Sequence, residues 1–291
     1  MATARGGGVL LRRRLAPALG LVPFLAYLLI FLVIPTVVVL AGAFQEKGSF
    51  SLTNIDALKE AASRTALGKS VLLSGSTAVI GAVLGAVLAW LVIGARPTSL
   101  LRRAVVSLSG VFAQMGGVSL AFAWIATIGY SGAVTNFFRS HLGIDLWGNG
   151  WLYALPGLIL VYCYFQIPLM VIVFLPALEG IRPQWQEAAV TLGASKWQYF
   201  SQVLVPLLRP AFLGCTLLLF ANAFAAYATA AALVSQGSPI VPLMIRQALT
   251  SEVVLGRQHL AYALALEMVV VVVVVMVLYG LLIRRSAKWL R

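Results

Sequence analysis

Glu267 is the one charged residue in the long apolar stretch 260–283. An ionised side chain in apolar surroundings is costly unless it is paired or serves a function. Two roles are open for this carboxyl group. It could line a path for a polar solute and favour a cation, or it could be a neutral or hydrogen-bonded group that fixes the packing of helices. We favour the packing role and keep the path role as the alternative.

Two other apolar stretches carry polar side chains. Tyr162 and Gln166 are four residues apart, which places both on one face of a helix. Asn222, Tyr227 and Thr229 bring polar atoms into a later apolar stretch in the same way. Residues of this kind either line a path through the protein or hydrogen-bond between packed helices, and both interpretations are kept.

Residue groupings that could hold a metal ion or form a catalytic centre are missing from the sequence. His141 and His259 stand alone, without the spacing of metal ligands. The Gly-Lys-Ser triplet at 68–70 resembles the end of a phosphate-binding loop, but that pattern needs a glycine where this chain has Ser63. We therefore expect no enzyme activity, no bound metal and no ATP binding by this chain.

The composition explains where these side chains must be placed. The chain has 291 residues, 61% of them hydrophobic and 10% charged, and the charges cluster between long uncharged stretches. Each stretch exceeds the about 20 residues that a membrane-spanning helix needs. The sequence predicts an all-α integral membrane protein that forms a single domain over residues 1–291, with six spans near 18–42, 70–94, 105–128, 152–178, 210–234 and 260–283.

The distribution of basic residues predicts the orientation of these spans. The N-terminus, the second and fourth loops and the C-terminal tail together hold 14 of the 21 Lys and Arg residues. Basic residues mark the cytoplasmic side of a membrane. Both termini and the loop 179–209 are therefore predicted to be cytoplasmic. The net charge of +13 is attributed to this topology and to anionic lipid headgroups, and no nucleic-acid partner is expected.

The loop 179–209 carries local signals for two short helices. Pro183 suits the first turn of a helix, and Gly193 is suited to the left-handed residue that ends one. Ser195 and Gln198 have the spacing of a capping box, which starts a new helix.

Pro206 and Pro210 are predicted to close this segment before the fifth span. A capped helix pair across the cytoplasmic face is suited to binding another protein and following its movement.

A family resemblance enters at this loop. Glu187, Ala188 and Ala189, followed by Gly193 six residues after the glutamate, resemble the E-A-A-x-x-x-G motif of ABC-importer permeases of the type I, binding-protein-dependent class. In that family the loop is the coupling helix, which sits in a groove on the ATPase subunit. The resemblance implies that these residues, together with Ser195 and Pro206, form an ATPase-docking loop.

Further stretches, residues 117–124, 164–169 and 222–230, resemble permeases of the polyamine, iron(III), thiamine and aminoethylphosphonate group. This resemblance implies a small polar solute, such as a polyamine or a phosphonate. Each stretch lies in a predicted span, so helix packing alone could also produce the likeness.

The resemblance implies a permease subunit of a bacterial inner-membrane importer with the type I fold. Its implied partners are a dimer of ATPase subunits that binds ATP and Mg²⁺, a second permease subunit and an extracytoplasmic solute-binding protein, besides the membrane lipid. The alternative is a secondary transporter in which Glu267 is a proton or cation site and no ATPase is needed. The six-span size and the helix pair of the fourth loop argue against this alternative.

Overall fold

The computed structural model describes residues 21–46, 49–96, 98–234, 240–250 and 258–287. The described chain consists of helices and their connections, apart from one pair of two-residue strands, in which β1 (Gln45–Glu46) pairs antiparallel with β2 (Ser49–Phe50). Six helical segments are long and apolar enough to cross a membrane, as the sequence predicts: Leu21–Gly42, Ala61–Ile93, Val118–Leu142, Leu155–Glu179, Lys196–Ala225 and Leu260–Leu281.

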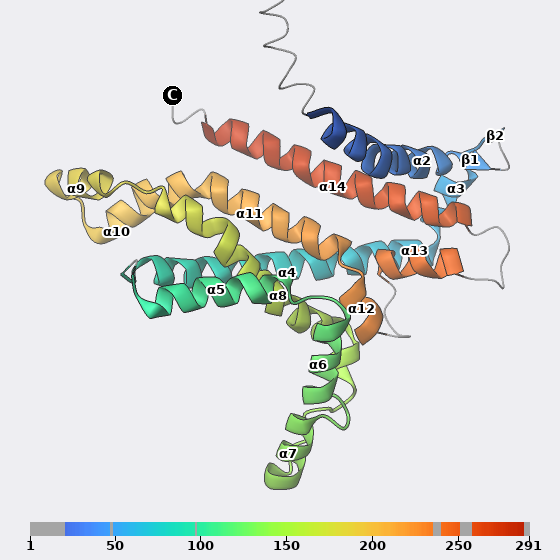
Figure 1. Cartoon of the computed structure of the whole chain (residues 1–291), viewed down its shortest axis with the longest axis horizontal. Helices are drawn as coiled ribbons and strands as arrows, with labels where there is room; N and C mark the ends of the chain where they lie inside the picture. The colour runs from blue at the N-terminus through green and yellow to red at the C-terminus, as the bar shows by residue number, and fades with distance from the viewer. Residues whose placement is uncertain (1–20, 47–48, 97, 235–239, 251–257, 288–291) are drawn as a thin grey trace, which may run out of the picture.

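Four helices form the central bundle: α4 (Ala61–Ile93), α5 (Leu100–Gln114), α8 (Leu155–Glu179) and α11 (Val205–Ala225). They lie side by side, and α8 packs against the other three (Figure 1). Gly81 and Gly85 allow α4 to approach α8, because a Cβ at Gly81 would lie 3.0 Å from Cβ of Gln166. The glycine pair therefore serves close helix packing, as expected for small residues spaced by four in a membrane.

Two helices run together along one edge of the bundle. The C-terminal α14 (Gln258–Ala287) contacts α2 (Ile34–Gly42), which continues the π-helical turn η1 (Leu29–Val33). The side chains of α2 and η1 include no buried residue. A helix that is apolar and exposed along its length needs a lipid environment.

The third span differs from the prediction of one helix over residues 105–128. The chain forms α5, breaks at Met115 to Gly117, and continues in a new direction as α6 (Val118–Ile128) and α7 (Ala133–Leu142), which project from the bundle (Figure 1). Gly117 has a φ of +83°, a conformation that only glycine adopts without strain. The apolar pattern continues through this break, so hydropathy alone could not reveal it.

The fifth span also differs from its predicted limits, 210–234. It begins earlier, at α10 (Lys196–Gln198), and passes through the π-helical turn η4 (Tyr199–Leu204) into α11. It ends at Ala225, and the separate short helix α12 (Ala228–Leu233) follows. The second span is longer than predicted, since α4 starts at Ala61 rather than near residue 70.

The remaining short helices lie at the two ends of the bundle. They are α3 (Thr53–Asp56), η2 (Ala57–Lys59), η3 (Trp151–Tyr153), α9 (Pro183–Thr191) and α13 (Val241–Thr250). Oγ of Ser70 on α4 accepts a 2.8 Å hydrogen bond from the backbone amide of Val241. This amide is the first of α13 and has no acceptor within its own helix.

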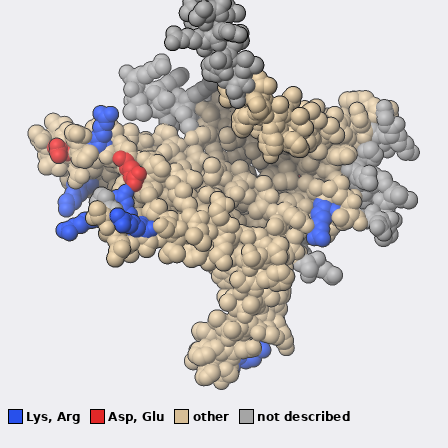
Figure 2. Space-filling view, viewed as in Figure 1, with Lys and Arg blue, Asp and Glu red and all other residues tan. Residues whose placement is uncertain are grey.

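Charged side chains gather at the end of the molecule that carries α9, α10 and the start of α5 (Figure 2). Arg102, near the start of α5, forms an ion pair there with Glu179, the last residue of α8. The predicted basic N-terminus lies outside the described residues, as do Lys288 and Arg291 of the basic tail, whereas Arg284 and Arg285 belong to the described helix α14. The cytoplasmic position of the loop 179–209 rests on these same basic residues and stays a prediction.

Candidate functional site

The helix α9 forms the first half of the loop predicted to dock a partner. Pro183 is its first residue, where the missing backbone N–H costs nothing. After α9 the chain turns at Gly193, which has a φ of +79°. The Gly193 amide bonds the carbonyl of Val190, and the Ala194 amide bonds that of Ala189, both at 2.9 Å. Gly193 thus ends the helix in the left-handed backbone conformation, as the sequence predicts.

The second half of the loop starts at the predicted capping box. The Gln198 amide donates to Oγ of Ser195 at 3.2 Å, and the Ser195 amide donates to Oε1 of Gln198 at 2.7 Å. The expected end of this short helix at Pro206 and Pro210 is wrong. Pro206 lies in the first turn of α11 after the π-helical turn, and Pro210 lies inside α11, so one helix runs on from the loop into the bundle.

The loop exposes large apolar side chains between the end of the fourth span and the first turn of the fifth. The exposed fractions are 87% for Leu192, 72% for Trp197 and 64% for Val190. Glu187 and Ala188 are exposed beside them, and Ala189 is partly buried. A group of exposed apolar side chains with polar residues around its edge is typical of an interaction site.

Four of the six predicted path residues lie where α8 meets the chain around α11 and α12. Gln166 is fully buried, and its Nε2 donates a 2.7 Å hydrogen bond to the carbonyl of Leu219. Nδ2 of Asn222 donates to Oε1 of Gln166 at 3.3 Å, and Asn222 itself is exposed. The amide pair therefore links the buried interface of α8 and α11 to an exposed polar surface.

Tyr162 and Thr229 satisfy backbone groups that the two helix breaks set free. The Tyr162 hydroxyl donates to the carbonyl of Ala226 at 2.7 Å, directly after α11 ends. Oγ1 of Thr229 accepts the amide of Gly117 at 2.7 Å, directly before α6 begins. Both side chains are buried, so the geometry gives them a packing role. The sequence analysis did not predict the helix break at Gly117. The two consecutive glycines Gly116 and Gly117 were the available signal.

Of the other two predicted path residues, Tyr227 lies next to this group, before α12, and Glu267 lies on α14. Tyr227 is partly buried at the second break, and the guanidinium of Arg246 lies over its ring, 6.0 Å from the centroid. Glu267 lies on α14, partly buried, and its Oε2 has no hydrogen-bond partner among the described residues. Arg246 was not a sequence candidate, because it lies outside the apolar stretches.

Metal-binding clusters of three or more His, Cys, Asp or Glu side chains do not occur within the described part of the chain. His141 makes only local contacts, with Ser140 and Phe137. The described residues therefore offer an exposed apolar loop and a polar helix interface as candidate sites.

Residues 81–288 match the family described as the binding-protein-dependent transport system inner membrane component. This match covers more than half of the chain. The chain belongs to this family. It is an inner-membrane transport component, a permease and not an enzyme, as the loop motif implied.

Two curated permeases illustrate the relationship. The chain is 26% identical over 200 residues to a ferric transport system permease protein of Actinobacillus pleuropneumoniae, a match that covers 67% of this chain and 28% of that protein. It is 26% identical over 226 residues to a sulfate transport system permease protein of Synechocystis, covering 77% of this chain and 78% of the relative. The chain thus spans less than a third of the length of the ferric relatives it matches.

The fold is shared with solved ABC-transporter structures. One is a bacterial alginate ABC transporter in complex with an alginate-pentasaccharide-bound periplasmic protein, with a TM-score of 0.78 and 21% sequence identity, covering 98% of this chain and 99% of the matched chain. The all-α permease fold predicted from the sequence is therefore confirmed.

Proposed function

We propose that this permease is the translocating subunit of an ATP-driven importer and that the loop from α9 to α10 docks on a separate ATPase subunit. The exposure of Leu192, Val190 and Trp197 around Glu187 carries the proposal. An exposed apolar patch of this kind is typical of a surface that a partner protein covers. The resemblance of this loop to the E-A-A-x-x-x-G motif supports an ATPase as that partner.

The helix path from the loop into the bundle suits the transmission of movement. From Lys196 to Ala225 the chain is one continuous helix, which ends beside the Gln166 and Asn222 pair. A rigid helix transfers displacement of one end to the other. Movement of the docked loop would therefore reach the polar interface between α8 and α11.

We further propose a complex of two permease subunits, two ATPase subunits and an extracytoplasmic solute-binding protein, with the loop on the cytoplasmic side. The ATPase subunits would supply ATP and Mg²⁺ binding. The charge at the α9 end supports this orientation.

For the solute, we propose a small inorganic oxyanion such as sulfate. The similarity to the sulfate permease covers more than three quarters of both chains, which supports an inorganic ion over the polyamine or phosphonate expected from the sequence. Asn222 offers an exposed amide donor, and Arg246 supplies a positive charge beside Tyr227. Ferric iron, the solute named for the Actinobacillus pleuropneumoniae relative, is the second candidate.

Uptake by proteoliposomes that hold the purified transporter tests this function. We expect radiolabelled sulfate to enter only when ATP is enclosed on the ATPase side, and unlabelled sulfate to compete more strongly than ferric iron, spermidine or aminoethylphosphonate. Uptake that needs an ion gradient and no ATP would make the chain a secondary transporter and overturn the proposal. Competition by ferric iron alone would refute the oxyanion and keep the importer.

A further inference from the structure

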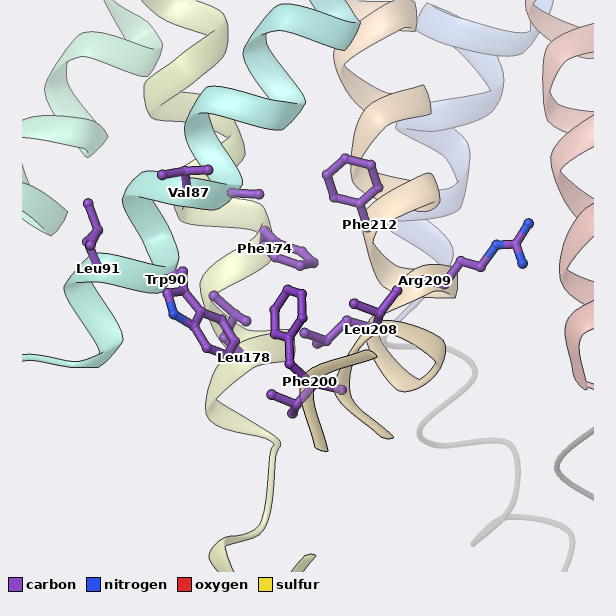
Figure 3. Close-up of a pocket in the computed structure, with 12 residues that line it drawn as sticks. Val87, Trp90, Leu91, Phe174, Leu178, Phe200, Leu208, Arg209 and Phe212 are labelled. Carbon is purple, nitrogen blue, oxygen red and sulfur yellow. The ribbon is translucent and has the colours of Figure 1, made fainter. Parts of the chain in front are cut away.

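An apolar cavity of about 480 Å³ opens between α4, α8 and α11 near the loop. Its wall is apolar apart from Arg209, with the aromatic rings of Phe174, Phe200 and Phe212 around the space and Trp90 on the α4 side (Figure 3). The rings of Trp90 and Phe200 meet edge to face with centroids 5.9 Å apart. The volume lies within the about 300–1,000 Å³ of typical ligand pockets.

A second cavity, of about 620 Å³, continues from the first toward the loop. The two share four lining residues: Trp90, Leu178, Phe200 and Leu204. The far part of the second cavity is polar, and it is lined by Arg182, Gln186, Ser195 and Lys196. Neither lining includes a carboxylate. The basic residues of the combined space are Arg182 and Lys196 near the loop and Arg209 on α11.

The space lies directly beneath the docking loop. Pro183, Gln186 and Val190 of α9 form one wall, and neither α9 nor α10 has a buried side chain. Protein side chains therefore leave the underside of the loop unfilled. An occupant of this space would support the loop against the bundle.

We propose that an anionic phospholipid binds here, with an acyl chain in the aromatic cavity and its phosphate beside Arg182 and Lys196. An amphiphile fits a space that changes from apolar to cationic, and basic pockets between helices at a cytoplasmic membrane boundary attract anionic headgroups. Arg209 also lines the first cavity, but its guanidinium points away from the aromatic side chains in Figure 3 and is not assigned to the headgroup. This site goes beyond the proposed function, since lipid retention does not depend on a docked ATPase.

Lipid retention by the purified full-length chain tests the site. The chain would be exchanged into nanodiscs of phosphatidylglycerol and phosphatidylcholine, returned to detergent, washed, and analysed by native mass spectrometry. We expect wild type to retain phosphatidylglycerol over phosphatidylcholine. Ala86→Trp, which fills the cavity, and the double variant Arg182→Gln/Lys196→Gln should each reduce retention at least about fivefold, the loss of about 1 kcal/mol of binding free energy.

Two matched variants control for unspecific effects. Leu84→Trp places the same bulky ring on an exposed position of α4 that lines neither cavity, and Arg103→Gln removes an exposed charge that lines neither. Both should retain lipid as wild type does. Equal retention in all variants, or equal retention of the two lipids by wild type, would overturn the proposal.

A photoreactive amino acid at Phe200 gives a second measurement that does not depend on how the variants fold. In intact membranes we expect crosslinks to phospholipid. Crosslinks to another protein chain, such as a second permease, would show that a helix fills the space and would also overturn the proposal.

Discussion

The backbone amide of Gly117 donates a 2.7 Å hydrogen bond to Oγ1 of Thr229, a residue 112 positions later in the chain. This bond joins the break before α6 to the start of α12. A side chain at one helix break thus accepts a hydrogen bond from the backbone amide that the other break leaves free. Irregular backbone at membrane depth is tolerated only where such partners exist.

Thr229→Val should destabilise the permease. The variant keeps the shape of the side chain but leaves the Gly117 amide without its acceptor, at a cost of about 1–3 kcal/mol. Thr229→Ser retains the oxygen and is the control. Unfolding in mixed micelles should separate the two variants, and equal stabilities would show that the bond does not hold the breaks together.

Gly85→Ala should destabilise the contact between α4 and α8. A Cβ at Gly85 would lie 2.7 Å from the carbonyl oxygen of Ile167, and overpacking of this kind costs about 1–3 kcal/mol. A Cβ at Gly75, on the same helix, would meet nothing within 4 Å. Thermal unfolding should therefore show a loss for Gly85→Ala and no loss for Gly75→Ala.

Asn222→Ala should reduce solute uptake about 3- to 10-fold, because an exposed amide gives up a hydrogen bond of about 0.5–1.5 kcal/mol to the solute. It should lower stability less than Gln166→Leu does, since its own bond to Gln166 is long, at 3.3 Å, whereas Gln166 also bonds Leu219 at 2.7 Å. Gln166→Leu should have the opposite profile. It removes a bond between helices, which is worth about 0.6–2 kcal/mol in membrane proteins. Uptake per folded molecule and unfolding, measured on both variants, check the contrast. Unchanged uptake in Asn222→Ala would exclude this residue from the path.

The turn after α7 should respond to acid. Arg139, through a 2.9 Å hydrogen bond, holds the pKa of Asp145 below its ordinary value of 3.8. A carboxyl with a lowered folded-state pKa stabilises the fold at pH values above the ordinary pKa, and this contribution is lost as the pH falls through the folded-state value. A spin label at Asn149 should therefore gain mobility only in strong acid. In Asp145→Asn the label should be mobile at neutral pH already; an immobile label there would contradict the role of this pair.

The sequence predicts much of this fold because the membrane imposes simple rules on it. Uncharged stretches long enough to cross a bilayer identified six spans, and local backbone chemistry identified the turn at Gly193 and the capping box at Ser195. The breaks at Gly117 and Ala226 were missed, because their backbone groups are satisfied by residues distant in sequence. The continuous helix through Pro206 was missed because the preceding π-helical turn has no clear sequence signal.

The candidate path shows the same limit. Spacing predicted that Tyr162 and Gln166 share a helix face, but not that the first bonds a broken helix end and the second pairs with Asn222. Glu267 was the most conspicuous residue in the sequence, and the structure places it on α14, apart from that group. Its role in the path or in packing stays a prediction.

The most direct test of the docking loop is co-purification from mildly solubilised membranes. Wild type, Glu187→Lys and Leu192→Asp would be compared with Glu60→Lys, which makes the same charge reversal on an exposed carboxylate at the opposite end of the bundle. We predict that mass spectrometry finds a P-loop ATPase with wild type and Glu60→Lys and loses it with both loop variants. An ATPase that co-purifies equally with all four chains, or with none of them, would contradict the account.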